Sequence, residues 1–247
     1  MDFLLIIVIC LIGPMIGSLI GILKKPSERI ICLLFSFCGG VMLTISFYNL
    51  LPESIKLASL LIAGLGVISG ALLMMLLDKI IPHCHIQAVG TSQQCLLKKA
   101  SMLLLIGMFL HNFPEGMAMA LGAVTSYKIT LLIALNISLH DIPEGICTGA
   151  PYYFYSKKRL KSFLISSATA VPTIIGYLLA HALFDNIARP TVGFIIALTA
   201  GIMIYLSIDE LLPTAYSGLS EKNKKTMVVA FILGAGIVLL NNFLINI

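Results

Sequence analysis

The sequence of 247 residues contains no tryptophan, and charged residues make up only 11% of it. Soluble domains average about 25% charged residues, so this chain has too little charge to cover a water-exposed surface. Hydrophobic residues make up 59%, and the mean hydropathy is +1.03. These values exclude a soluble or disordered chain. They predict an all-α integral membrane protein, because lipid offers no hydrogen bonds and each helix satisfies its own backbone.

Eight apolar segments are long enough to cross the hydrocarbon core of a bilayer, which takes about 20 helical residues. We expect a single transmembrane domain over residues 1–247, with no room for a soluble domain. The predicted spans are residues 3–23, 30–51, 57–78, 101–123, 129–150, 162–184, 191–212 and 227–246.

Basic residues are concentrated in alternate connections between the spans. Of the 16 Lys and Arg residues, 13 follow spans one, three, five and seven, and only Lys56, Lys128 and Arg189 lie elsewhere. Short basic loops remain in the cytoplasm. We therefore expect a multi-pass protein of the plasma membrane with both termini outside. These loops also account for the net charge of +5, so we expect no nucleic-acid partner.

Spans two and seven end in related sequences. GGVMLTISFYNLLPES (39–54) and AGIMIYLSIDELLPTA (200–215) share a glycine, a methionine, a serine, two leucines and a proline at an offset of 161. This offset indicates an internal duplication. Because five crossings separate the copies, they run in opposite directions. The predicted arrangement is 3+2+3, with inverted repeats (spans 1–3 and 6–8) around a central pair (spans 4–5), a design typical of alternating-access transporters.

The central pair carries two copies of one polar motif, HNFPEG (111–116) and HDIPEG (140–145). Each places a histidine and a glutamate four residues apart, on one helix face. A single buried histidine is most often a hydrogen-bonded core residue, but ionisable groups in a span are costly and here they occur twice. The four N/O ligands suit a divalent transition metal such as Zn²⁺, whereas imidazole disfavours Ca²⁺ and Mg²⁺. The expected ligands are His111, Glu115, His140 and Glu144.

Asn112 and Asp141 follow the two histidines at matching positions. Each stands three residues before the glutamate of its own motif, so the two glutamates could bridge to a second, adjacent metal position. Asp141 makes that position acidic. We therefore also count Asn112 and Asp141 as candidate metal ligands.

Polar residues at the outer end of span two could line an entrance. Asn49 and Glu53 lie there, although Glu53 could simply be solvated. Met42, earlier in the same span, could offer a thioether to the central site, although methionine within a membrane most often packs against other side chains.

Two groups lie on the predicted cytoplasmic side. Asp209 and Glu210, near the inner end of span seven, could form part of an exit route or cap the helix. His83 and His85, in the loop after span three, form a short metal-capable cluster with Cys84 that could accept an ion leaving the pore.

Together these features resemble the ZIP family of metal transporters (Zrt- and Irt-like proteins), and the paired motifs look most like its bacterial ZupT-like branch. The resemblance implies a 3+2+3 helix fold, import of divalent metal toward the cytoplasm and frequent homodimers. One departure stands out, because the branch has a glutamate before a proline in span six where this chain has Val171. By position, the resemblance implies a primary site of His111, Glu115, His140 and Glu144, a secondary site including Asn112 and Asp141, and an exit near Asp209 and Glu210.

The leading hypothesis is a transporter that carries Zn²⁺, and also Fe²⁺, Mn²⁺, Co²⁺ or Cd²⁺, by alternating access. The metal is then the transported substrate and not a cofactor, and the protein is not an enzyme. The alternative is a membrane-embedded zinc metalloenzyme, such as an intramembrane protease, in which a glutamate acts as general base. The sequence lacks HExxH, and its inverted repeats suit passage better than hydrolysis. A metal sensor would need a signalling domain, for which the loops are too short.

Overall fold

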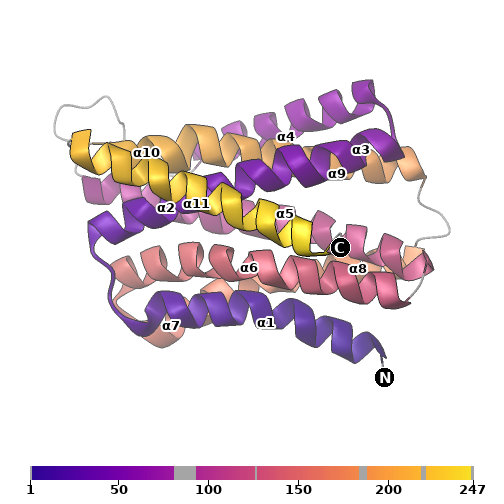
Figure 1. Ribbon diagram of the computed structural model, residues 1–247, viewed down its shortest axis with the longest axis horizontal. Coiled ribbons are helices and arrows are strands. Elements are labelled where there is room, and N and C mark those ends of the chain that lie inside the picture. Colours follow the sequence, from indigo (N-terminus) through magenta and orange to yellow (C-terminus); the bar gives the residue numbers. More distant parts are fainter. Residues whose placement is uncertain (1, 81–92, 126, 184–187, 218–220, 246–247) are drawn as a thin grey trace.

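The computed structural model describes residues 2–80, 93–125, 127–183, 188–217 and 221–245. Within these ranges every regular element is helical, as the composition predicts. Long helices lie side by side along one direction (Figure 1). The elements are α1 (Asp2–Leu23), α2 (Glu28–Thr44), η1 (Ile45–Leu50), α3 (Leu51–Leu57), α4 (Leu60–Ile80), α5 (Gln93–Thr125), α6 (Tyr127–Ser156), α7 (Arg159–Ser167), η2 (Ala168–Ala170), α8 (Val171–Leu183), α9 (Arg189–Tyr205), η4 (Leu206–Leu211), α10 (Leu212–Tyr216) and α11 (Glu221–Ile245).

Six helical stretches in the described part of the chain are long and apolar enough to cross a membrane. They correspond to predicted spans one, two, three, six, seven and eight. Spans four and five correspond to α5 and α6, which have 33 and 30 residues but are not among the six. The count of eight spans and the 3+2+3 arrangement therefore remain predictions.

The main boundary differences arise where helices continue beyond the hydrophobic run. The second predicted span was expected to end at residue 51, but the helix continues to Leu57, so that the next helix begins at Leu60 and not at 57. The fourth begins at Gln93, eight residues before the expected start. Polar residues are tolerated in a terminal turn, so hydropathy alone cannot fix such ends.

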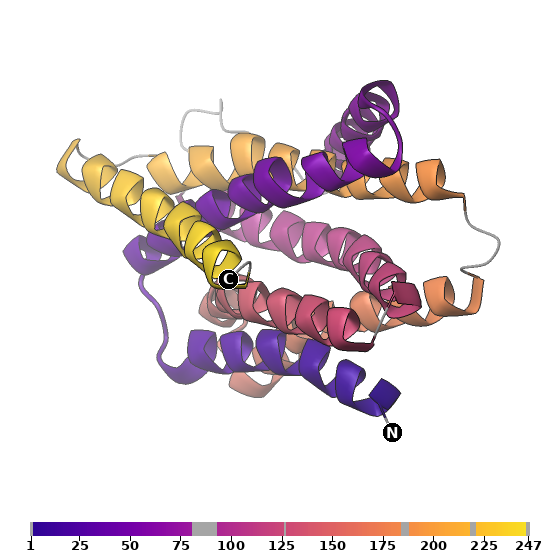
Figure 2. The ribbon, with the colours of Figure 1, turned by 45° about the vertical axis from the view of Figure 1, so that its right-hand side comes forward.

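The helices pack as two bundles. The first bundle contains α1, α5, α6, α7 and α8, and the second contains α2, α3, α4, α9, α10 and α11. Figure 2 shows α1 beside α6 in the first bundle and α11 across α2 in the second.

Close backbone contacts at glycines lie within the two bundles. A Cβ added at Gly17 of α1 would clash with the backbone of α6, and one added at Gly70 of α4 would clash with the backbone of α9. Between the bundles, by contrast, Gly107 of α5 meets the side chain of Leu206. Small residues let membrane helices approach closely, so each bundle is packed more tightly than the seam between them.

The duplicated segments share an unusual backbone feature. Each contains a π-helical turn, η1 and η4, and the offset of 161 relates the two turns. The Ser46 hydroxyl donates to the Met42 carbonyl at 2.8 Å, and the Ser207 hydroxyl donates to the Met203 carbonyl at 2.8 Å. A proline follows each turn and lacks a donor, which a π-bulge accommodates. Figure 1 shows α2–α3 running opposite to α9–α10, as expected for an inverted repeat.

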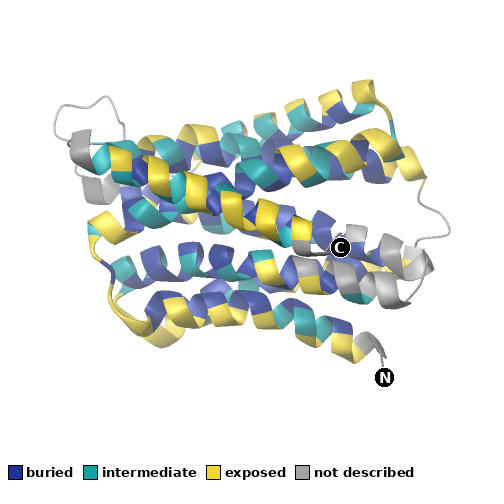
Figure 3. Ribbon diagram, in the orientation of Figure 1, coloured by how far each residue is buried: buried dark blue, intermediate teal, exposed yellow. Residues whose placement is uncertain are grey.

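The outer faces of the helices are apolar. Leu60 and Leu61 of α4 are each 74% exposed, and Leu233 of α11 is 61% exposed. Figure 3 shows such exposed positions along the outward faces of α1, α4 and α11. Apolar faces of this extent are stable against lipid and not against water, so the fold is that of a multi-pass membrane protein.

The two termini lie at one end of the molecule, and basic connections lie at the other. The first helix begins and the last helix ends at the same end of the molecule (Figure 1). The connections that follow α1 and α6, which contain Lys24, Lys25, Lys157 and Lys158, lie at the other end. The assignment of this basic end to the cytoplasm remains a prediction from the positive-inside rule.

Candidate metal centre

The two motif helices, α5 and α6, are continuous through their prolines, and α8 and α1 hold them in place. Pro114 lies inside α5, and Pro143 lies inside α6. Gly116 of α5 lies against the backbone of α8, and Gly145 of α6 lies against the backbone of α1. The glycine of each motif therefore anchors its helix one residue beyond the glutamate.

The histidines pair across the two helices. His111 Nε2 lies 3.3 Å from Glu144 Oε2, and His140 Nε2 lies 3.4 Å from Glu115 Oε1. The sequence spacing predicts that each histidine meets the glutamate of its own helix, but the shortest contacts join opposite helices. The four side chains nevertheless come together from antiparallel helices, and all four are largely buried.

Asp141 lies close to the same group. Its Oδ1 atom is 3.7 Å from His140 Nε2, and one ligand atom each from Glu115, His140 and Asp141 fit within 4.8 Å of one another. Asp141 is 1% exposed. Three groups of the types that bind transition metals thus meet at one point.

Several ligand atoms at this point have no hydrogen-bond partner. Among the described residues, the unsatisfied buried atoms include Asn112 Oδ1, Glu115 Oε2, both Asp141 oxygens, Glu144 Oε1 and His140 Nε2. Buried polar atoms are satisfied in the great majority of cases, and isolated buried carboxylates are expensive. A divalent cation would satisfy these lone pairs together.

His111 is oriented for ligation. Its Nδ1 atom donates a hydrogen bond to the Gly107 carbonyl at 2.9 Å, because a carbonyl can only accept. Nδ1 therefore carries a proton, and Nε2 is the ring nitrogen that faces Glu144 Oε2, at 3.3 Å. Metal-binding histidines are commonly held in this way, by a second partner on the other ring nitrogen.

The Asn112 amide connects the site to the helix of predicted span six. Its Nδ2 atom donates to the Thr169 carbonyl at 2.6 Å, which leaves Oδ1 without a partner. Thr169 lies in the short 3-10 turn η2, directly before Val171. The Val171 side chain is 44% exposed, and Thr173 is buried with an unsatisfied hydroxyl. Sequence reasoning had noted Val171 but missed Thr169 and Thr173.

A cavity of about 130 Å³ adjoins the site. Glu115 and His140 line it, together with Asn49 and Asn242. These two asparagines pair reciprocally, because Asn49 Nδ2 donates to Asn242 Oδ1 at 3.0 Å and Asn242 Nδ2 donates to Asn49 Oδ1 at 2.9 Å. Asn49 thus lines the same cavity as Glu115 and His140, and its place on an entrance route remains a prediction. Asn242 was missed, although NN is unusual in an apolar span.

Glu53 lies on the surface. Its carboxylate is 3.3 Å from Lys56 Nζ, and the two side chains are 51% and 72% exposed. This agrees with the interpretation that Glu53 is solvated. Met42 is fully buried in an apolar cluster with Met203 and Leu206. Its packing accords with the structural alternative, and no thioether ligand is needed to explain it.

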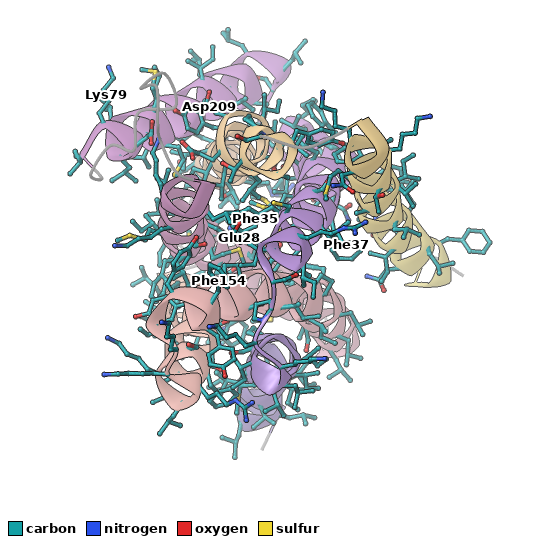
Figure 4. All side chains as sticks on the ribbon, turned by 90° about the vertical axis from the view of Figure 1, so that its left-hand side faces the viewer. Glu28, Phe35, Phe37, Lys79, Phe154 and Asp209 are labelled. Carbon is teal, nitrogen blue, oxygen red and sulfur yellow. The ribbon has the colours of Figure 1, made fainter. Side chains whose placement is uncertain are left out.

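At the basic end, Glu210 is buried and Asp209 is exposed. Figure 4 views the molecule from this end and labels Asp209 and Lys79. Lys99 Nζ lies 2.8 Å from Glu210 Oε1 and 2.6 Å from Asp78 Oδ1. Neither Asp78 nor Lys99 was singled out from the sequence as a site residue, although both are charged residues at the edge of a span. His83 and His85 lie outside the described residues.

Lys99 precedes the predicted span 101–123, and its side chain is only 9% exposed. Burial lowers the pKa of Lys99, but the hydrogen bonds and charges of Asp78 and Glu210 raise it by more, so the net pKa is above its ordinary value. The ammonium group therefore stays charged between the carboxylates.

Comparison with known proteins identifies the family. The ZIP zinc transporter family matches residues 87–242. The zinc transporters ZupT of Salmonella newport, Salmonella typhimurium and Salmonella typhi are each 36% identical over 208 residues, which cover 81% of this chain and 81% of each relative. The chain belongs to the ZIP family. The resemblance drawn from the paired motifs is therefore confirmed, including its ZupT-like branch.

The ZIP match includes both motif helices and also Asp209 and Glu210. It also explains why a membrane bundle holds so many buried polar groups, since membranes tolerate such groups where they serve a substrate path. The match does not assign individual ligands. The assignment of ligands to His111, Glu115, His140 and Glu144 remains a prediction from their chemistry and position.

Proposed function

We propose that this ZIP protein imports Zn²⁺ into the cytoplasm through a site formed by His111, Glu115, His140 and Glu144. The observation that carries the proposal is the convergence of buried, unsatisfied ligand atoms from the two antiparallel motif helices. Asn112 and Asp141 form the adjoining secondary position, which lacks a carboxylate at Val171. The names of the Salmonella relatives support zinc as the substrate.

The donor set favours a transition metal. Imidazole nitrogens with carboxylates suit Zn²⁺, Co²⁺, Fe²⁺, Mn²⁺ and Cd²⁺, whereas Ca²⁺ and Mg²⁺ prefer oxygen alone. We expect a tenfold excess of Cd²⁺ or Co²⁺ to inhibit zinc uptake, and the same excess of Mg²⁺ to leave it unchanged. Inhibition by Mg²⁺ would contradict the histidine-based site.

Alternating access is the proposed mechanism. The cavity that joins Asn49 and Asn242 to His140 supports entry from the end that we expect to face outward. The buried ion pairs of Lys99 lie at the opposite end. Tight packing within each bundle and looser packing between them support movement of one bundle against the other. The site would then face each side in turn.

The test is uptake of labelled zinc by proteoliposomes that contain the purified protein. We expect the His111→Ala/Glu115→Ala double variant to lose at least about tenfold in uptake, because two ligands are removed. Uptake that survives this double change would refute the assigned site.

Two matched controls have the same residue types outside the site. His181→Ala removes a histidine that stacks on Tyr177 with ring centroids 5.9 Å apart, and Glu53→Ala removes an exposed glutamate. Both should transport within about twofold of the unmodified protein, since neither contacts the centre. Metal-dependent cleavage of a membrane substrate without zinc flux would instead support the metalloenzyme hypothesis.

A further inference from the structure

Lys99 is a cation from one bundle buried between two carboxylates of the other. It projects from α5 of the first bundle, whereas Asp78 lies on α4 and Glu210 lies on η4 of the second. The Nζ distances of 2.6 and 2.8 Å are those of short, charge-assisted contacts. This group therefore links the two bundles at the end that we expect to face the cytoplasm.

The internal duplication identifies the positions of the other repeat that correspond to Asp78 and Glu210. The offset of 161 relates Glu210 to Asn49. Gly40 lies against the Phe231 carbonyl and Gly201 lies against the Val67 carbonyl, so Phe231 corresponds to Val67. Eleven residues beyond these positions stand Asn242 and Asp78. The outer pair of asparagines thus corresponds to an inner pair of carboxylates.

The two pairs differ in what they require. Two amides satisfy each other, as Asn49 and Asn242 do with two hydrogen bonds. Two neighbouring carboxylates, one buried and one half-buried, have no donor to share and repel one another, so they need a cation. Lys99 supplies that cation, and it does so from the opposite bundle.

We propose that Lys99 is the cytoplasmic gate of this transporter, a positioning residue whose ammonium group ties the first bundle to Asp78 and Glu210 and closes the inner end. The gate rests on the proposed function, because it assigns a step of the same transport cycle. Zinc passes to the cytoplasm only after Lys99 leaves the carboxylates and the bundles part.

A native cysteine reports on this opening. Cys147 of α6 is fully buried, and its thiol donates to the Leu34 carbonyl of α2 at 3.2 Å. It therefore lies in the seam between the bundles. It comes one turn after Glu144 on the basic-end side of the site. Parting of the inner ends would expose this thiol to the cytoplasm.

The experiment measures the labelling rate of Cys147 by a membrane-impermeant maleimide applied to inside-out membrane vesicles. The full-length protein retains only this cysteine, with serine in place of Cys10, Cys32, Cys38, Cys84 and Cys95. We expect Lys99→Met to label at least about tenfold faster than its parent, because the closed state loses its tie. Lys99→Arg retains the charge and should label within about twofold of the parent.

A triple variant, Lys99→Met/Asp78→Asn/Glu210→Asn, separates a gate from a purely structural ion pair. It recreates the uncharged amide pair of the outer end within the second bundle, but it has no tie to the first. The gate predicts that it labels as fast as Lys99→Met. A structural role within the second bundle predicts the parent's slow rate, and that result would overturn the proposal.

The triple variant also serves if Lys99→Met does not fold, because it leaves no buried charge unpaired. Size-exclusion profiles and zinc affinity establish that each variant is folded. A parental labelling rate in folded Lys99→Met would equally overturn the gate. The labelling rate of Cys147 measures the opening of the inner end and does not depend on which ion is transported. If the unmodified protein took up no zinc, the proposed function would be refuted. The gate would still be tested by the labelling rates of the Lys99 variants.

Discussion

The contact of Gly116 with α8 gives a stringent test of how the candidate metal centre is held in place. The Cβ of an alanine at this position would lie 1.9 Å from the Thr173 carbonyl oxygen, and real Cβ atoms essentially never come within 3.0 Å of such an atom. The two helices would therefore have to separate by at least about 1.1 Å. Both partners of this clash lie in helices, so the backbone has little freedom to adjust.

This separation would reach the site directly. The hydrogen bond from Asn112 to the Thr169 carbonyl, now 2.6 Å, would lengthen to about 3.7 Å and be lost. Overpacking costs about 1–3 kcal/mol, and a buried polar group left without its partner costs about 1–3 kcal/mol more. We expect Gly116→Ala to lose roughly 2–6 kcal/mol of stability, and zinc affinity to fall at least about tenfold, which corresponds to about 1.4 kcal/mol.

The assays are thermal unfolding in detergent and zinc titration by calorimetry. Gly64→Ala is the matched control, because a Cβ there meets nothing within 4 Å. It should keep its zinc affinity and unfold at an unchanged or slightly higher temperature, since alanine is favoured over glycine inside a helix by about 0.5–1 kcal/mol. Equal unfolding temperatures and equal zinc affinities for the two variants would refute the reasoning.

Two further predictions concern the ligands and the outer pair. Protons compete with metal for imidazole and carboxylate ligands, so zinc affinity should be lower at pH 5.5 than at pH 7.5, and equal affinities in calorimetry would argue against histidine ligation. Asn49→Ala leaves the Asn242 amide unpaired and should cost about 1–3 kcal/mol of stability. The double variant with Asn242→Ala should cost clearly less than the sum of the single changes, and strict additivity in thermal unfolding would contradict the pairing.

Much of the architecture could be predicted from local pattern. Hydropathy predicted helices at every span, because the need to satisfy backbone groups in lipid allows little else. The repeated GxM...S...LLP segment predicted the equivalence of spans two and seven, and the same offset relates their π-helical turns. It did not predict the turns themselves, since the shift from a four-residue to a five-residue hydrogen bond depends on a proline that other helices accommodate differently.

The side-chain pairings at the candidate site depend on contacts between helices, which the spacing of residues in the sequence does not predict. Helical periodicity predicted that His111 and Glu115 share a face, but the side chain nearest to His111 Nε2 is Glu144 of the neighbouring helix. The crossing of α5 and α6 decides this pairing, and side chains elsewhere in the bundle decide the crossing. Lys99 was counted with the basic loop residues. Its pairing with Glu210 was not predicted, because Glu210 lies 111 positions away in the sequence.

A duplicated backbone does not require duplicated chemistry. The two repeats place corresponding positions at opposite ends of the path, with asparagines at 49 and 242 and carboxylates at 210 and 78. The neutral amides, at the end that we expect to face outward, satisfy each other and present no net charge to an approaching cation. Carboxylates at the end that we expect to face the cytoplasm attract a cation, and Lys99 supplies one there. The backbone is therefore symmetric but its two ends are chemically different, because only the pair of carboxylates requires a cation.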